Sequence, residues 1–566
     1  MSRITPSAGT RRQFRLLVRA SIRHLLTHVT AARDADPVNV AIWLTALATA
    51  PALLFAVRNA IDYPFLLPLP PEAAARALLT DRVFFVLYGM LTAALLASLV
   101  WEVLVPTRED QEILGVLPVR PPTVAAARLT AAVVVATSFT AAVSVPAALL
   151  FGVGSSALPM AGGPVRAVAG HLAATMPASL LVFLTLLAAR SMLVHAGERI
   201  VSRAAVGLQL VAIVALIEVF FFLPAVTGVV IDGVQGGGAW WLPPVWFAAL
   251  YGQVAGSPGT PGGLPALGLT ATIAAAVLAI AVTLPPAGWM ARRALDGQAA
   301  PHAGMLSWLP RAVARSAGTP AVRSVLVFAL ASLARSRRHL LLLVSYLGVG
   351  IALAALRLAA ELLQGRPVFD QPRSFVLAVP LVLVFFTVVG LRACCAVPTD
   401  LDANWAFRLQ TPSVGDVQAA IRLLLLWLGV APVVAACSLA SAWLWGWHTA
   451  LTIVVLDVLA GVLLCELLVA SWTKVPFASG HEPAIETVKS RWPWFVAALW
   501  VFGFGLADLH RWVLDSPAGM AVYALVGILA VGGAYGRTHR MRRGRAVRLD
   551  PDVQTFEGLR LSPAEE

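Results

Sequence analysis

Twelve long apolar runs constrain this chain more than any other feature of its sequence. The hydrocarbon core of a bilayer is about 30 Å thick, so a helix that crosses it needs about 20 mostly apolar residues. Of the 566 residues, 59% are hydrophobic and only 13% are charged, whereas about 25% of an ordinary soluble protein is charged. The sequence therefore predicts an all-α membrane protein. Its spans lie near residues 39–57, 83–104, 129–152, 167–194, 204–223, 266–288, 338–356, 374–396, 420–445, 449–472, 493–509 and 518–536.

The arginine and lysine residues between these runs predict the orientation of the chain. If the N-terminus lies in the cytoplasm, the cytoplasmic segments hold 34 of these residues and the outer loops hold 8. Because positive charge favours the cytoplasmic side, we expect both termini in the cytoplasm. The expected location of the chain is a bacterial inner membrane. The formal net charge of +13 then indicates contact with membrane lipids, and no nucleic acid is expected as a partner.

A charged, proline-marked segment occurs twice, between the second and third apolar run of each half. Residues 105–129 and 397–423 both begin Val-Pro-Thr and both reach the next run through Arg-Leu. Each has an acid five residues after the valine and a leucine twelve residues after it. We call these segments the first and second island. Their positions predict two six-helix repeats in one chain.

An amphipathic stretch precedes the first span of each half. Residues 11–33 place apolar side chains on one helical face and four arginines on another, which is typical of a helix in the headgroup plane. A helix packed on a cytosolic domain would show the same apolar face. The second stretch precedes the seventh span. The expected segments are a tail with an amphipathic helix (1–38), a first six-span half (39–288), a linker with a second amphipathic helix (289–338), a second six-span half (339–536) and a basic tail (537–566).

This layout resembles the ABC-2 type of ATP-binding-cassette transporter permeases. The family has an interfacial elbow helix, six spans, a cytoplasmic helix between spans two and three that docks on the ATPase, and interfacial helices between spans five and six. The matching parts are residues 11–33, the first six spans, the first island with its Leu-Pro-Val-Arg at 117–120, and the loop 224–265. The second half matches at 322–338 and 397–423 but lacks the long loop before its last span. The resemblance implies a separate ATPase subunit as partner.

The islands are the candidate docking elements for that ATPase. A short amphipathic helix seated in a groove can transmit a movement, and aromatic and arginine side chains are common interface anchors. An ordinary interspan loop with these charges would instead be solvated. The candidate docking residues are Glu109, Asp110, Glu112, Ile113, Leu114 and Leu117 in the first island, and Asp402, Trp405, Phe407, Arg408 and Leu409 in the second.

Four ionisable residues inside the predicted spans are further candidates, because charge within a bilayer is costly and often functional. They are Arg190, Glu218, Asp457 and Glu466. A hydrogen bond between spans would satisfy such a group equally well.

Catalytic and cofactor motifs are missing from the sequence. The only lysines, Lys474 and Lys489, do not lie in a phosphate-binding loop, and no zinc-protease or serine-hydrolase motif occurs. The four cysteines lack metal-ligand spacing. We therefore expect no enzyme activity, no cofactor and no metal in this chain.

The sequence leads us to expect the membrane part of an exporter for an amphipathic or lipid-like substrate. One alternative is an ion-coupled secondary transporter of the major-facilitator layout, which also has six plus six spans. Another is a membrane scaffold that transports nothing.

Overall fold

The computed structural model describes most of the chain as helix. The described residues are 8–30, 37–68, 70–100, 108–195, 198–235, 238, 240–257, 263–296, 313, 315–365, 369–399, 407, 409, 412–478, 493–542 and 547. Within them the secondary structure is helical and no strand occurs. The chain divides into unit 1, Met1–Ala300, and unit 2, Pro301–Glu566, a boundary that lies inside the linker expected at 289–338.

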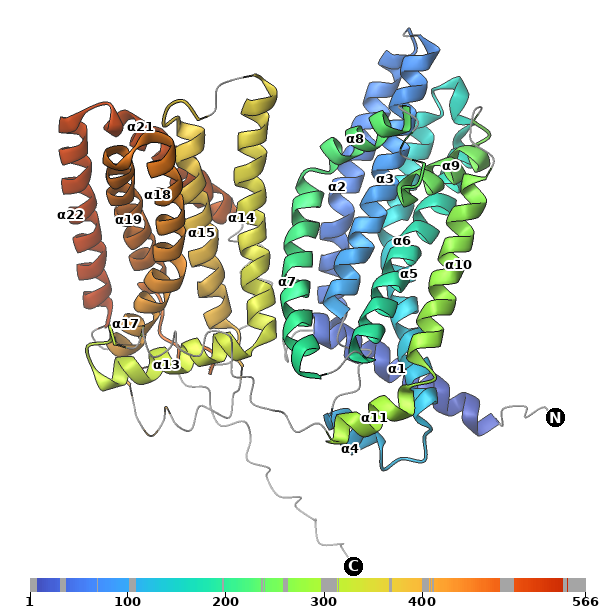
Figure 1. The fold of residues 1–566 in the computed structure, drawn as a ribbon, viewed down its shortest axis with the longest axis horizontal. Coiled ribbons are helices and arrows are strands. Elements are labelled where there is room, and N and C mark those ends of the chain that lie inside the picture. Colours follow the sequence, from blue (N-terminus) through green and yellow to red (C-terminus); the bar gives the residue numbers. More distant parts are fainter. Residues whose placement is uncertain are drawn as a thin grey trace, which may run out of the picture. The chain divides into compact units, whose positions relative to one another are not determined.

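Unit 1 is a bundle with two short helices inserted before its last span (Figure 1). Its α-helices are α1 (Ala8–Thr30), α2 (Pro37–Leu66), α3 (Pro71–Val100), α4 (Arg108–Leu114), α5 (Pro121–Ser155), α6 (Pro164–His195), α7 (Glu198–Phe221), α8 (Leu223–Gln235), α9 (Pro243–Ala255), α10 (Leu264–Thr283) and α11 (Ala287–Asp296). The central helix is α3, which packs against α5, α6, α7, α8 and α9. At Gly89 of α3 an added Cβ would lie 2.9 Å from Ser179 Oγ of α6, so a small residue permits this close helix packing.

Unit 2 is a second bundle, built around α15. Its helices are α13 (Pro320–Arg335), α14 (Arg337–Leu363), α15 (Ser374–Ala396), α17 (Val414–Leu425), α18 (Ala431–Trp445), α19 (Trp447–Val469), α21 (Leu506–Leu514) and α22 (Pro517–Arg542). A π-turn at Leu426–Val430 joins α17 to α18, just before Pro432, whose ring cannot donate a backbone hydrogen bond. A second π-turn, Trp500–Gly505, precedes α21.

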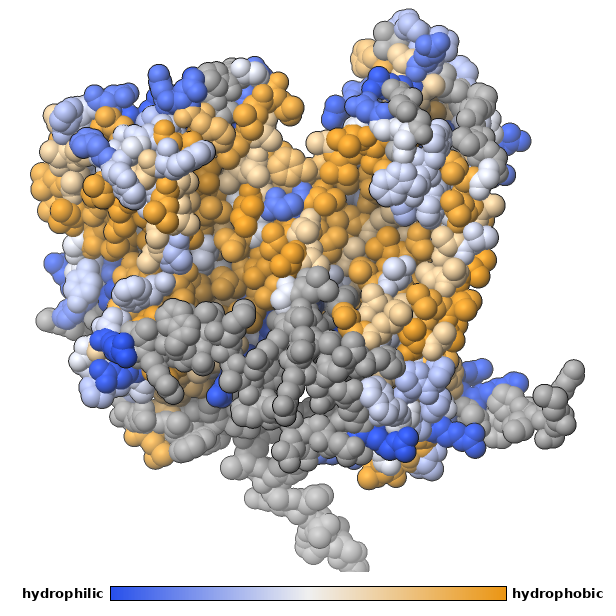
Figure 2. Space-filling model, viewed as in Figure 1, coloured by the Kyte–Doolittle hydropathy of each residue, from blue (hydrophilic) through white to orange (hydrophobic). Residues whose placement is uncertain are grey.

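Eleven helices of the described chain are long and apolar enough to cross a membrane, and a bent pair makes a possible twelfth. These spans coincide with the predicted runs, which confirms a multi-pass, all-helical membrane protein. The exception is the fifth run, where α7 and α8 meet at 79°. Pro224 lies at this bend and lacks the N–H that would continue the helix ladder. In Figure 2 an apolar band covers the helices of each unit between more hydrophilic ends.

The amphipathic helices predicted before spans one and seven are present as α1 and α13. In Figure 1 each crosses the end of its own bundle. Leu25 of α1 is buried against α3, α5 and α6, while Arg12, Arg15, Arg19 and Arg23 are exposed. In α13, buried residues from Val322 to Leu333 pack against unit 2. We call the bundle end that α1 crosses the α1 end of unit 1, and the bundle end that α13 crosses the α13 end of unit 2.

Candidate functional site

The first island forms α4 and a turn that leads into α5 at the α1 end of unit 1. Asp110 of α4 pairs with Arg128 of α5, with 2.9 Å between Oδ2 and Nη2. The Arg128 side chain is 8% exposed and that of Asp110 is 22% exposed. Asp110 was predicted at the rim of a docking surface, but the structure places it as the link between α4 and the first span-forming turns of α5.

Three apolar side chains of the first island are exposed. Ile113 is 68% exposed and Leu117 is 48% exposed, as the docking prediction requires, and Val116 between them is 82% exposed. Glu112 is exposed and Leu114 is half-buried. Glu109 lies in α4, but its side chain is outside the described set. Val116 was missed by the sequence reasoning, although its position between two predicted contact residues was a usable signal.

The second island is placed differently. Phe407 is 5% exposed, and its ring lies 5.0 Å from that of Phe328 in α13 at an angle of 71°. Leu409 is 76% exposed. Asp402, Trp405 and Arg408 lie outside the described residues. The expectation that Phe407 is offered to a partner is therefore corrected: its ring is part of the apolar core that holds α13.

The matching motifs of the two islands lie at different positions relative to their helices. In the first island Pro-Thr-Val (122–124) is inside the first turn of α5, whose N-cap is Arg120. In the second, Pro-Ser-Val (412–414) spans the start of the helix: Val414 is the first residue of α17, and Ser413 caps it in a reciprocal pair with Asp416. Arg128 and Arg422 are nevertheless the eighth and ninth residues of their helices. The arginines correspond better than the proline motifs do.

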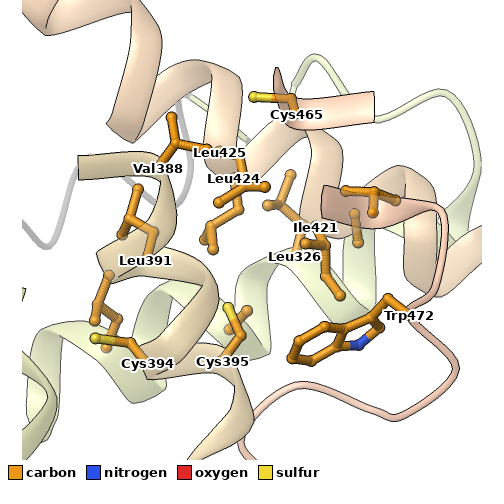
Figure 3. Close-up of a cluster of buried hydrophobic side chains, with 14 of the residues drawn as sticks. Leu326, Val388, Leu391, Cys394, Cys395, Ile421, Leu424, Leu425, Cys465 and Trp472 are labelled. Atoms are coloured by element: carbon orange, nitrogen blue, oxygen red, sulfur yellow. The ribbon is translucent and has the colours of Figure 1, made fainter. Parts of the chain in front are cut away.

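Residues 471–478, which follow α19 and are not helical, pack at the α13 end of unit 2 near the second island. Trp472 packs with Leu326, Val388, Cys395 and Ile421 in the cluster of Figure 3. The segment after α19 is tied down by backbone hydrogen bonds, from Thr399 N to Phe477 O (2.8 Å) and from Phe477 N to Cys395 O (3.1 Å). The buried amide of Gln418 donates to Trp472 O at 2.9 Å. These contacts of the segment after α19 were not predicted from the sequence.

Glu466, one of the predicted intramembrane residues, has a partner in the same end of unit 2. Its carboxylate accepts two hydrogen bonds from the guanidinium of Arg422, one of them 2.9 Å from Nη2 to Oε2. Both side chains are largely buried. Arg422 also lies 5.0 Å from the ring centre of Tyr535 in α22. The pair therefore connects α17, α19 and α22.

The other three intramembrane candidates lie in three different helices. Arg190 is half-buried in α6, and Glu218 is half-buried in α7, one turn before the bend at Phe222. Asp457 of α19 is buried beside His510 of α21, with 3.5 Å between Oδ1 and Nδ1, and His510 Nε2 lies 2.8 Å from the hydroxyl of Tyr523 in α22. Neither His510 nor Tyr523 was predicted from the sequence, because no motif or spacing connects either residue with Asp457.

A polar network also lies at the end of unit 1 opposite to α4. Arg82 was predicted from the sequence to be one of the basic residues of the outer loops, but it is buried in α3, where it donates to Ser257 Oγ at 2.9 Å and lies over the ring of Tyr251. Burial raises the pKa of Tyr251 to about 12, so its hydroxyl keeps its proton at neutral pH. The Tyr63 hydroxyl donates to Asp81 at 2.5 Å. The contacts of Arg82 therefore join α3 to α9, and the Tyr63–Asp81 hydrogen bond joins α2 to α3.

Among the described residues no group of three or more His, Cys, Asp or Glu side chains is placed to hold a metal ion. Comparisons with protein-family models, with curated proteins and with solved structures find no match to this chain.

Proposed function

We propose that this chain is the membrane-spanning part of an ABC-2-like exporter, with two six-helix halves and a separate ATPase. What supports the two halves is that each has an amphipathic helix before its first span, an island after its second span, and a second span, α3 or α15, at its centre. The short helices α8 and α9 lie where the family has helices between spans five and six. The second half lacks them, as its sequence indicates.

The orientation that fits this proposal has the α1 and α13 ends in the cytoplasm of a bacterial inner membrane. The exposed arginines of α1 support it, since they are placed to meet anionic headgroups. Both termini are then cytoplasmic, in line with the distribution of basic residues along the sequence.

The observation that carries the docking proposal is the open apolar surface of Ile113, Val116 and Leu117 on the first island. Apolar side chains at the end of a membrane bundle, flanked by the exposed Glu112, form the kind of patch that a partner protein covers. The Asp110–Arg128 pair joins this surface to α5. A movement of the ATPase against the first island would therefore be transmitted directly to α5, the third span.

The substrate we propose is amphipathic or lipid-like, and it would pass outward between the two halves as their exposure alternates. The support is the apolar composition of the spans of each unit. ATP hydrolysis would occur on the partner, since this sequence has no phosphate-binding loop.

Co-purification from the native host tests the proposal. The membrane protein is isolated in mild detergent, and bound proteins are identified by mass spectrometry for the wild type and for Leu117→Asp. The matched control is Val165→Asp, because Val165 is 81% exposed at the opposite end of unit 1. We expect a soluble ATPase with the wild type and the control, and its loss from the Leu117 variant. If the ATPase is absent throughout, or is kept by Leu117→Asp, the docking proposal is wrong.

A second candidate function is ion-coupled secondary transport, and the buried Asp457–His510 pair favours it. Under this proposal a proton or sodium gradient alone would drive uptake into vesicles that contain only this chain. Such uptake, lost in Asp457→Asn, would replace the ATPase proposal.

A further inference from the structure

Asp457, His510 and Tyr523 form a row of polar groups inside unit 2. Asp457 is 2% exposed near the middle of α19, and His510 is fully buried in α21. Neither Asp457 Oδ1 nor His510 Nδ1 has a hydrogen-bond partner, although the two atoms are 3.5 Å apart. On its other side the imidazole meets the hydroxyl of the half-buried Tyr523 at 2.8 Å. The row therefore runs from a buried acid to a residue nearer the surface.

The surroundings of this row are apolar. Leu381 of α15, Ile453 and Ala460 of α19, and Ala507 of α21 belong to one buried cluster. The titratable groups that face the pair from neighbouring helices, among the described residues, are the hydroxyl of Tyr523 and the thiol of Cys437 in α18. Asp508 and Arg511 of α21 are exposed on other faces of that helix. Among the residues of these helices that the structure describes, no fixed charge is placed to compensate an ion at Asp457 or His510.

A net charge at this position would be costly, because moving a single ion out of water costs several kcal/mol even after the protein relaxes. The acid and the imidazole together are neutral only when they hold one proton between them. This is true whether the proton is on the ring or on the carboxyl group. With no proton the pair carries a charge of −1, and with two protons it carries +1. The packed bundle therefore favours the state with one proton.

We propose that Asp457 and His510 form a binding site for a single proton, and that Tyr523 relays this proton to and from the site. In the empty state Asp457 is a carboxylate, and His510 is neutral with its hydrogen on Nδ1. A proton arriving at the Tyr523 oxygen lets the tyrosine pass its own hydroxyl hydrogen to Nε2, so the tyrosine ends unchanged and the ring becomes an imidazolium facing the carboxylate. Release reverses these transfers and requires water to reach α21 and α22. This inference does not depend on an ATPase partner.

Counting protons on unfolding tests the site. The full-length chain in detergent, weakly buffered at pH 8, is unfolded with an excess of denaturing detergent, and the protons released are measured with a pH indicator. Free Asp and His side chains in water are both largely deprotonated at pH 8. The wild type should therefore release about one proton per chain more than Asp457→Asn, in which the native site is neutral without a proton.

The control is Tyr523→Phe, which removes the relay but leaves the pair, so it should release the same number of protons as the wild type. If Asp457→Asn does not purify as a folded protein, the double variant Asp457→Asn/His510→Gln replaces it, because two amides can hydrogen-bond across the same gap. Equal release from the wild type and the variant that lacks the acid would overturn the proposal. So would a loss of the extra proton in Tyr523→Phe alone, because the pair would then not be where the proton is held.

Discussion

The two islands show how one sequence pattern leads to two different local structures. In the first island apolar side chains of the segment stay open at the α1 end, and an acid within the island neutralises Arg128. In the second island Phe407 is buried against α13, and the corresponding arginine, Arg422, pairs with Glu466 of α19. The difference teaches that the arginine near the start of the third span of each half pairs with an acid in both units, while that acid comes from the island itself in unit 1 and from α19 in unit 2.

The largest effect is expected from breaking the ion pair of unit 2. Glu466→Gln leaves Arg422 charged and largely buried, and removing one partner of a buried ion pair costs about 3–5 kcal/mol. The free energy of unfolding in detergent, followed by circular dichroism, should fall by this amount. In the double variant Arg422→Met/Glu466→Leu most of the loss should be recovered, because no unpaired charge remains. A single variant as stable as the wild type would show that the pair does not hold unit 2 together.

Truncating the buried aromatic ring of the second island should cost somewhat less. Phe407→Ala removes the contact with Phe328 and leaves a cavity, so we expect a loss of about 3 kcal/mol in the free energy of unfolding. The matched change is Leu409→Ala, two residues along the same island but 76% exposed, which should shift stability by less than about 0.5 kcal/mol. Equal losses in the two variants would contradict the buried position of Phe407.

Breaking the ion pair of unit 1 should have a moderate effect. Asp110→Asn removes the charge opposite Arg128, and leaving a buried hydrogen-bonding group without its partner costs about 1–3 kcal/mol. The loss should be smaller than for Glu466→Gln because Asp110 is partly exposed, so that water can replace some of its contact. A loss as large as that of Glu466→Gln, measured under the same conditions, would mean that the two islands are equally part of their cores.

The smallest effect on stability is expected at the open surface of the first island. Ile113→Ser and Val116→Ser change side chains that are mostly exposed, so each should alter the free energy of unfolding by less than about 0.5 kcal/mol. If these residues bind an ATPase, both variants should still lose that partner in co-purification. Strong destabilisation would instead place these side chains in the core and remove the contrast between the islands.

Most of the fold could be predicted from the sequence, but the contents of the candidate site could only partly be predicted. The spans and the helices before spans one and seven were recognisable from apolar length and from the helical spacing of arginines. Ile113 and Leu117 were also recognisable, because they are apolar residues in a charged segment. Phe407 was wrongly expected at an open surface for the same reason, since a local pattern does not say whether α13 covers it. His510 and Tyr523 were missed, because nothing next to them in sequence marks a polar contact.

The sequence by itself determined that the chain crosses a membrane many times, because bilayer thickness imposes a length and an apolar composition that each span must carry locally. It also placed the two islands between the correct spans. Tertiary structure alone decided which acid meets which arginine, which island is open, and which titratable groups face each other inside unit 2. These choices depend on contacts between distant segments, such as Arg422 with Glu466 and Asp457 with His510. Burial and pairing at those contacts are properties of the packed helices, and no single stretch of sequence contains them.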